Sequence, residues 1–142
     1  MIAPTVLLVD DEAAFVDVVS RRLALRGFDV ARAAGGAEAL DLLERVPNIE
    51  VVVLDLKMPG LDGLATLERI KQDYPLVGVI MLTGHGTVLS SVECLKAGAF
   101  DYLMKPTDTE SLVAKIESAA HQNRQNQNLV VTIRSSPTGS RA

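Results

Sequence analysis

Five short apolar runs alternate along this chain with longer segments of helical periodicity. Most of the runs are β-branched and continuous rather than alternating with polar residues, which is typical of strands buried on both faces of a parallel sheet. The runs are residues 6–9, 28–31, 51–54, 77–82 and 102–104. The second run is interrupted by Asp29, so we expect its strand to lie at an edge of the sheet.

Between the runs, apolar residues recur every three or four positions, as on one face of a helix. These stripes are Phe15, Val19 and Leu23; Ala39, Leu42, Leu43 and Val46; Leu64, Leu67 and Ile70; Val88, Val92 and Leu95; and Leu112, Val113, Ile116, Ala119 and Ala120. Asp62 and Asp108 stand where N-caps would begin helices, and Gly27 and Gly98 stand where left-handed residues would end them. Five βα units with right-handed crossovers predict a doubly wound α/β fold with a five-stranded parallel sheet of order 2-1-3-4-5.

Size and charge narrow the classes of function. A chain of 142 residues is long enough to bury a core in one domain. Its net charge of −4 argues against direct binding of nucleic acid, and its one cysteine, Cys94, excludes an intrachain disulfide. We interpret Cys94 as a structural residue on the fourth helix. The first residues do not resemble a signal peptide and no apolar run approaches about 18 residues, so we expect a cytoplasmic protein without a membrane segment.

The composition changes after about His121. Residues 122–128 are polar and low in complexity, and residues 135–140 resemble a linker. Residues 129–133 between them have strand propensity but no evident partner. We therefore expect one domain over residues 1–121 and a disordered polar tail or linker over residues 122–142. This tail has three open origins: a native extension, the start of a linker, or an artificial addition.

Reactive side chains follow four of the five predicted strands. Asp10 and Asp11 follow the first, Asp55 the third, Thr83 the fourth and Lys105 the fifth. In the order 2-1-3-4-5 these four strands are adjacent, and their carboxyl ends open into one crevice, where ligands bind in open α/β sheets. Each residue alone has an ordinary explanation as a helix cap or a loop residue. Their convergence on one crevice favours a functional site.

Three carboxylates in a small crevice repel one another, because two unit charges ~4 Å apart cost ~4 kcal/mol at an effective dielectric of ~20. Either some are protonated or a cation lies among them. Oxygen ligands suit a hard ion such as Mg²⁺, with Mn²⁺ as an alternative. Such an ion beside an ammonium and a hydroxyl suits a transferring phosphoryl group, and one carboxylate can be the nucleophile. Asp55 is the better candidate because its strand is central, which leaves Asp10 and Asp11 as the metal pair.

These motifs resemble the receiver domain of two-component response regulators, which has the flavodoxin-like fold of the single-domain chemotaxis regulator. The resemblance covers about residues 4–121. Its motifs are residues 8–12 (Leu-Val-Asp-Asp-Glu), 53–63 (Val-Leu-Asp-Leu-Lys-Met-Pro-Gly-Leu-Asp-Gly), 81–84 (Met-Leu-Thr-Gly) and 97–106 (Ala-Gly-Ala-Phe-Asp-Tyr-Leu-Met-Lys-Pro). No one of them is specific alone, but together, in this order and spacing, they are highly specific.

The resemblance implies a role for each matching residue. Asp55 would be the phosphoacceptor, and the Mg²⁺ ligands would be Asp10, Asp11, Asp55 and the backbone carbonyl of Lys57. Thr83 would be the switch hydroxyl, Tyr102 the switch aromatic and Lys105 the phosphoryl-binding lysine, with the bond from Lys105 to Pro106 usually cis in the family. Lys57 and His85 occupy loop positions that influence the lifetime of the phosphoryl group in the family, although a solvated loop histidine is as good an explanation of His85.

The resemblance also implies partners. The phosphodonor would be a sensor histidine kinase or a phosphotransfer protein, and the output protein or domain would dock on helix 4, strand 5 and helix 5. The chain would not be a turnover enzyme on an external substrate, and the family allows dimerisation on phosphorylation. Both a stand-alone regulator and the receiver part of a longer one fit the sequence.

Three rivals remain. A phosphatase of the haloacid dehalogenase type also forms an aspartyl phosphate, but it wants a second acid where this chain has Lys57. A flavodoxin-like mononucleotide binder needs a phosphate loop where this chain has an acidic triplet. A receiver that has lost its chemistry would not keep every key side chain.

Overall fold

A computed structural model describes residues 5–135, in which five strands and five helices alternate. The strands are β1 (Thr5–Val9), β2 (Asp29–Ala33), β3 (Ile49–Leu54), β4 (Gly78–Thr83) and β5 (Asp101–Met104). The helices are α1 (Ala13–Leu25), α2 (Gly36–Arg45), α3 (Gly63–Asp73), α4 (Val88–Lys96) and α5 (Thr109–Ser135). The predicted alternation of strand and helix is confirmed.

The strands form one parallel sheet in the order β2-β1-β3-β4-β5, as the sequence predicts. The strand that the sequence marks as weakest, β2, lies at an edge. All of its residues except the last, Ala33, are half-buried or exposed, whereas β3 and β4 are buried along nearly their whole length. Burial on both faces explains why the central strands are continuous apolar runs.

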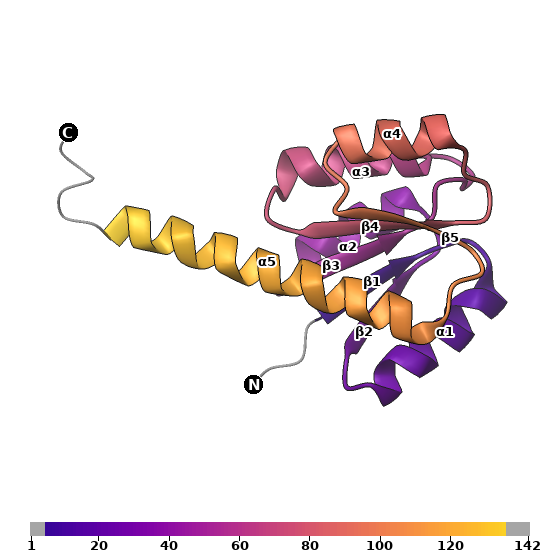
Figure 1. The fold of residues 1–142 in the computed structure, drawn as a ribbon, viewed down its shortest axis with the longest axis horizontal. Coiled ribbons are helices and arrows are strands. Elements are labelled where there is room, and N and C mark those ends of the chain that lie inside the picture. The colour runs from indigo at the N-terminus through magenta and orange to yellow at the C-terminus, as the bar shows by residue number, and fades with distance from the viewer. Residues whose placement is uncertain (1–4, 136–142) are drawn as a thin grey trace.

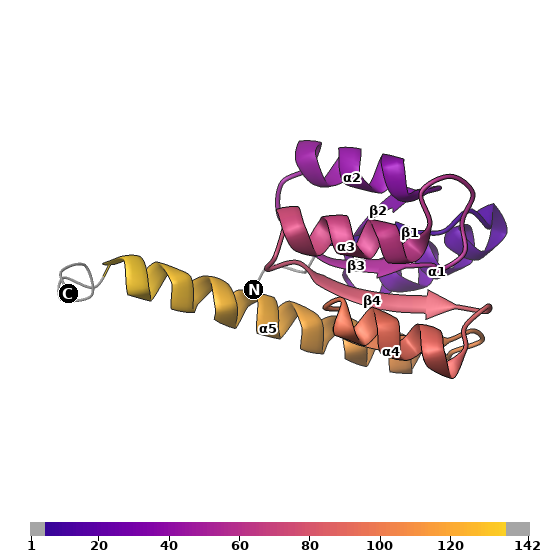
Figure 2. The same cartoon turned by 90° about the horizontal axis from the view of Figure 1, so that it is seen from above.

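Helices cover both faces of the sheet (Figures 1 and 2). On one face, α2, α3 and α4 pack on the sheet through buried residues that include Leu43, Leu67 and Cys94. On the other face, α1 and α5 pack through residues that include Leu23 and Ile116. Cys94 is 1% exposed, which agrees with the structural role expected for it. The three central strands between these two cores are therefore shielded from water along most of their length, and a ligand can approach them at their ends.

The predicted helix boundaries rest on identifiable contacts. Asp62 accepts a hydrogen bond from the backbone N–H of Ala65 at 2.8 Å and caps α3, and Asp108 accepts one from the N–H of Ser111 at 2.6 Å ahead of α5. Gly27 and Gly98 have φ angles of 90° and 107°, in the left-handed region that favours glycine.

The last helix differs from the sequence-based expectation. α5 runs for 27 residues to Ser135, so the structure gives residues 122–135 as helix, where the sequence suggests a polar tail or linker and, at residues 129–133, strand propensity. The chain has no glycine or proline between Pro106 and Pro137, so nothing interrupts the helix. Residues 136–142 of the expected tail lie outside the described residues.

Contacts to the sheet explain why this polar segment stays helical. The amide of Asn123 donates a hydrogen bond to the carbonyl of Leu76, and the guanidinium of Arg124 pairs with both carboxylate oxygens of Glu50 at 2.7 and 2.9 Å. Glu50 lies near the start of β3, so these contacts fasten α5 to the amino end of the sheet. Beyond them α5 extends away from the domain (Figures 1 and 2). Among residues 5–135, no helix combines the length and apolar composition that a membrane span requires.

Candidate functional site at the carboxyl end of the sheet

Strand register places Asp10 and Asp55 side by side. Val9 at the end of β1 pairs with Leu54 at the end of β3, so the residue that follows each strand is an aspartate. The backbone N–H of Asp55 donates to the carbonyl of Val9 at 3.0 Å, which extends the pairing by one step. The two acids are thus held by backbone contacts, before their side chains make any contact of their own.

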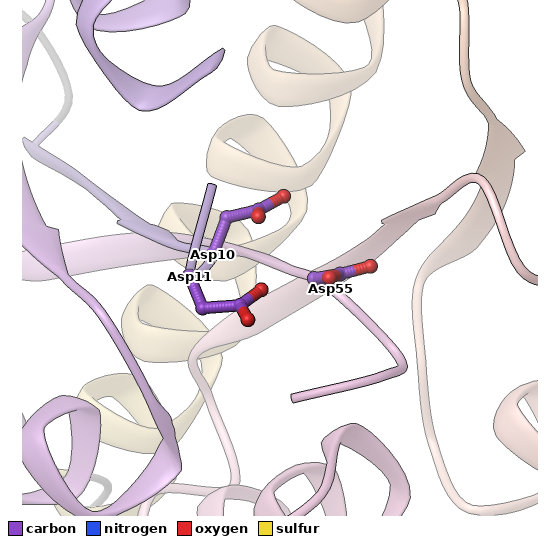
Figure 3. A group of neighbouring side chains, drawn as sticks. All are labelled: Asp10, Asp11 and Asp55. Atoms are coloured by element: carbon purple, nitrogen blue, oxygen red, sulfur yellow. The ribbon is translucent and has the colours of Figure 1, made fainter. Parts of the chain in front are cut away.

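Three carboxylates gather at this point. Asp10, Asp11 and Asp55 each offer a carboxylate oxygen, and these oxygens lie within 4.8 Å of one another. Figure 3 shows the three side chains extending from the ends of β1 and β3 to the same side. Asp10 and Asp55 are each 3% exposed, whereas Asp11 is exposed to solvent. Two buried oxygen donors and one open to water suit a hard divalent cation that keeps some of its waters.

The surroundings of Asp55 disfavour its charged form. Burial, and then the charge of Asp10, raise the pKa of the Asp55 carboxyl above its usual range. Hydrogen bonding to Thr83, the charge of Lys105 and a 2.9 Å hydrogen bond from the N–H of Leu56 act in the opposite direction. Burial and the repulsion between carboxylates outweigh these contacts in their effect on the pKa of Asp55. A cation bound among the three carboxylates would therefore be stabilised by their negative charge.

The loop after Asp55 is tightly held. The N–H of Gly63 donates to the carbonyl of Leu56 at 2.8 Å. A Cβ atom at Gly63 would lie 2.5 Å from the Cα of Leu56 and 2.8 Å from its carbonyl oxygen, so only glycine fits there without a shift of the backbone. This close approach fixes the loop that carries Lys57, whose side chain is exposed. The role of the Lys57 carbonyl as a metal ligand stays a prediction.

Thr83 is the last residue of β4, and Lys105 directly follows the neighbouring strand β5. Thr83 is fully buried, and its carbonyl accepts a 2.8 Å hydrogen bond from the N–H of Lys105. Its side-chain oxygen accepts a hydrogen bond from the N–H of His85 at 3.1 Å, and its proximity to Asp55 lowers the pKa of that carboxyl. The peptide bond between Lys105 and Pro106 is cis, as the resemblance implies. The fold therefore brings the predicted acids, hydroxyl and ammonium to one end of the sheet.

The ammonium of Lys105 has partners that the sequence does not predict. Its Nζ donates to Asp10 Oδ2 and to Glu12 Oε1, both at 2.7 Å, and lies 4.1 Å from the centre of the Phe15 ring. Burial lowers the pKa of Lys105, but the two carboxylates outweigh this effect and raise it. The same contact lowers the pKa of Glu12. The acidic triplet of residues 10–12 is the sequence feature that could have identified Glu12 as part of the site. The helical periodicity predicts Phe15 only as a residue on the buried face of a helix.

Tyr102 lies outside this cluster. Its hydroxyl is 2.9 Å from Ser90 Oγ on α4, and its side chain is partly buried. A Cβ atom at Gly86 would lie 2.8 Å from Tyr102 Cζ, so the ring packs directly against the backbone that joins β4 to α4. His85, in the same loop, is exposed. Tyr102 thus contacts the segment that follows Thr83, but not the carboxylates.

Comparison with known proteins agrees with this geometry. The family model described as "Response regulator receiver domain" matches residues 6–117. The chain is 40% identical over 124 residues to the DNA-binding transcriptional regulator NtrC of Escherichia coli K12, a match that covers 86% of this chain and 26% of the relative. The curated relatives that it matches are thus longer, and the chain spans about a quarter of their length.

Solved structures give the same answer. A CheY-like receiver domain protein from Methanospirillum hungatei JF-1 superposes with a TM-score of 0.82 at 31% identity, over 87% of this chain and 98% of that one. NtrX from Brucella abortus, crystallised with ADP, superposes with a TM-score of 0.84 at 31% identity, over 96% of this chain and 31% of that one. With its fold, its acidic cluster and its matching family model, the chain belongs to the response regulator receiver domains, of the type found in NtrC and NtrX.

Proposed function

We propose that this domain is a phosphorylation-controlled switch in which Asp55 accepts a phosphoryl group in the presence of Mg²⁺. The observation that carries the proposal is the meeting of three carboxylate oxygens within 4.8 Å, beside the lysine that follows β5. Asp10, Asp11, Asp55 and the carbonyl of Lys57 would hold the ion. When bound, Mg²⁺ would neutralise charge on the carboxylates and on the phosphoryl oxygens.

The transfer itself requires little from the protein beyond placement. An Asp55 carboxylate oxygen forms a bond to phosphorus as the bond from phosphorus to the donor breaks, and the donor leaves with that electron pair. The donor would be a phosphohistidine of a sensor histidine kinase or of a phosphotransfer protein. Thr83 ends β4 and Lys105 follows β5, the two strands beyond β3 in the sheet, and both side chains would contact the phosphoryl oxygens.

The energy of these contacts is sufficient for a switch. A phosphoryl group adds about −1.5 to −2 charge and can form one to three charge-assisted hydrogen bonds. At ~1.5–3 kcal/mol each, two such bonds supply roughly 3–6 kcal/mol. Reversing a 1:99 equilibrium needs about 5.5 kcal/mol. Movement of Thr83 toward the phosphoryl group would pull on the loop that Tyr102 packs against, and so would change the surface of α4.

The output surface would be the face formed by α4, β5 and α5. Apolar side chains are exposed here to an unusual degree: Val88 is 83% exposed and Leu89 70%, with Met104 of β5 at 46%. Exposed apolar side chains gathered on one face are typical of an interaction surface. An output protein or an output domain of a longer regulator would dock there, in the cytoplasm, and the receiver would not itself contact nucleic acid. Dimerisation on phosphorylation would use the same face.

Asp55 would be a phosphoacceptor and not the nucleophile of a turnover enzyme. A phosphatase of the haloacid dehalogenase type would need an acid where Lys57 stands. The only reaction expected after transfer is slow hydrolysis of the acyl phosphate, catalysed within the domain itself.

Intact-mass measurement tests the proposal. The wild type in Mg²⁺ and acetyl phosphate should gain about 80 Da, the mass of one phosphoryl group, and Asp55→Asn should not. EDTA should prevent the adduct. Incubation with a generic phosphomonoester should give no steady release of phosphate. A wild type that stays unmodified in magnesium buffer, or an Asp55→Asn protein that gains the same mass, would contradict the proposal.

A further inference from the structure

Lys105 is bound away from Asp55 in this structure. A phosphoryl-binding lysine has to meet oxygens carried on Asp55, yet the hydrogen bonds of its ammonium go to Asp10 and Glu12, each at 2.7 Å. The face of the Phe15 ring, 4.1 Å from Nζ, lies against it as well. Asp55 acts on Lys105 through its charge alone. Two of the three N–H donors of this ammonium are thus engaged by carboxylates, with which a phosphoryl group would have to compete for the lysine.

The two carboxylates that hold Lys105 differ in what a metal ion would do to them. Asp10 is 3% exposed and belongs to the acidic cluster. A cation bound in the cluster would neutralise the charge of Asp10 and weaken its attraction for Lys105. Glu12 lies outside that cluster, and its side chain is 61% exposed. It follows Asp11 immediately and precedes the first residue of α1, so its backbone position is fixed by the loop and the helix. A hydrogen bond from the Glu12 N–H to Asp10 Oδ1, at 2.9 Å, ties the loop together.

We propose that Glu12 is a positioning residue that keeps the Lys105 ammonium at the rim of the crevice and competes with the incoming phosphoryl group for it. This inference rests on the proposed function. Once a cation is coordinated by Asp10, Glu12 is the carboxylate that remains hydrogen-bonded to Lys105. Glu12 therefore sets how readily the lysine moves to Asp55, and its negative charge also disfavours the approach of an anionic phosphodonor.

Removing the charge of Glu12 should make the domain easier to phosphorylate. We expect Glu12→Gln to form the Asp55 adduct about two- to fivefold faster than the wild type in Mg²⁺ and acetyl phosphate, the size of effect that an exposed ion pair supports. The ratio of the two rates should shrink toward one as salt is raised, because screening weakens the wild-type contact and leaves little to weaken in the variant. A merely structural role for Glu12 would not give this dependence on salt.

Glu110→Gln is the matched control. Glu110 is also an exposed glutamate in an ion pair, with Arg26, and lies at the start of α5 outside the acidic cluster. The substitution makes the same change in net charge, so a general effect of charge on acetyl phosphate would appear in both variants. We expect the rate of Glu110→Gln to equal that of the wild type.

A second readout needs no phosphorylation. Nζ lies over the Phe15 ring, 4.1 Å from its centre, so the neighbouring Cε protons of Lys105 should carry an upfield ring-current shift in the NMR spectrum. In EDTA this shift should be present in both the wild type and Glu12→Gln, since Asp10 still holds the lysine. With Mg²⁺ and no phosphodonor, it should persist in the wild type and collapse in Glu12→Gln.

The outcomes separate the two claims. A wild type without an Asp55-dependent adduct defeats the proposed function and this inference together. A wild type that forms the adduct, beside a Glu12→Gln protein that reacts at the same rate or more slowly, defeats the inference alone. So does a ring-current shift in Glu12→Gln that survives Mg²⁺. A rate gain that Glu110→Gln shares would assign the effect to net charge and would also overturn the role of Glu12.

Discussion

The two ends of the sheet differ in how far their charged side chains are paired with partners. At the carboxyl end, the carboxylates of Asp10, Asp11 and Asp55 crowd together, and the neighbouring cation, Lys105, is divided between Asp10 and Glu12. At the amino end, Glu50 is matched by Arg124 through two hydrogen bonds. The ammonium of Lys71 there donates to the carbonyls of Pro75 and Val77 at 2.8 and 2.9 Å. One end is left with excess negative charge, and the other has its charges satisfied.

This difference separates reactivity from support. Repulsion among buried carboxylates costs stability, and a site retains it only where binding of a cation or a phosphoryl group can relieve it. The matched contacts at the amino end hold the sheet and α5 in place whatever happens at the other end. A switch needs both properties, because a change at the carboxyl end must act on a framework that does not yield.

Two glycines give the largest test of this comparison. A Cβ atom at Gly63, in the loop after Asp55, would press on the backbone of Leu56 at 2.5 Å, whereas one at Gly78, at the start of β4, would meet the side chain of Ala119 on α5 at 3.0 Å. We expect Gly63→Ala to lower the free energy of unfolding by about 2–4 kcal/mol, because a backbone contact cannot give way cheaply. Gly78→Ala should cost about 1 kcal/mol or less, because α5 can shift by a fraction of an ångström.

Urea unfolding measured by circular dichroism would compare the two variants. Gly63→Ala should also lose the phosphoryl adduct, since its clash lies against the residue next to Asp55, while Gly78→Ala should keep it. Equal losses of stability in the two variants would contradict the view that the loop after Asp55 is the more tightly constrained of the two places.

How far the sequence predicts this molecule depends on the range of each contact. The strand ends that carry Asp10, Asp55, Thr83 and Lys105 follow from local periodicity and the rules of parallel sheets, so the sequence alone is enough to place them. The contact between Glu12 and Lys105 joins residues 93 positions apart and has no local signature. The length of α5 escapes prediction for the same reason. Asparagine is a weak helix former although glutamine is a good one, and this polar segment shows no apolar stripe of helical period. The carbonyl that accepts from Asn123 lies 47 residues away in sequence.

The raised pKa of Asp55 predicts an effect of intermediate size on stability, which tests whether the carboxyl end of the sheet is electrostatically strained. Burial and the charge of Asp10 raise the pKa of Asp55. Between the unfolded value of 3.8 and the higher folded value, the folded protein binds more protons than the unfolded chain, so the free energy of unfolding falls as pH rises through this window. Asp55→Asn has no carboxyl group to titrate at this position, so its free energy of unfolding does not show this fall. In EDTA at neutral pH it should exceed the wild type in stability by about 1–2 kcal/mol after allowance for screening by water.

The difference between the two proteins should shrink as pH falls toward the unfolded value, and thermal or urea unfolding across this range would measure it. Mg²⁺ should stabilise the wild type more than Asp55→Asn, because the ion relieves repulsion that the variant no longer has. An Asp55→Asn protein that is less stable than the wild type in EDTA at neutral pH would show that the carboxyl end is not under electrostatic strain.

The smallest effect is expected where α5 leaves the sheet. Asn123 is 3% exposed, donates to the Leu76 carbonyl and accepts from Gln127 at 2.8 Å. Asn123→Ala should lower the free energy of unfolding by roughly 0.5–1 kcal/mol, the usual net worth of a hydrogen bond, with part of the loss returned by the better helix propensity of alanine. Asn128→Ala is the control, since Asn128 is exposed on the same helix and its replacement should be neutral or slightly stabilising.

Hydrogen exchange would locate this effect. In Asn123→Ala, amide protons after residue 123 should exchange several-fold faster, while those of β1 and β3 keep their protection, because the substitution loosens the helix from the sheet without disturbing the core. In Asn128→Ala, exchange in both regions should match the wild type. If Asn123→Ala left the exchange of residues 124–135 unchanged, the helix would be held by its own propensity, and the amino end of the sheet would have no part in directing α5 away from the domain.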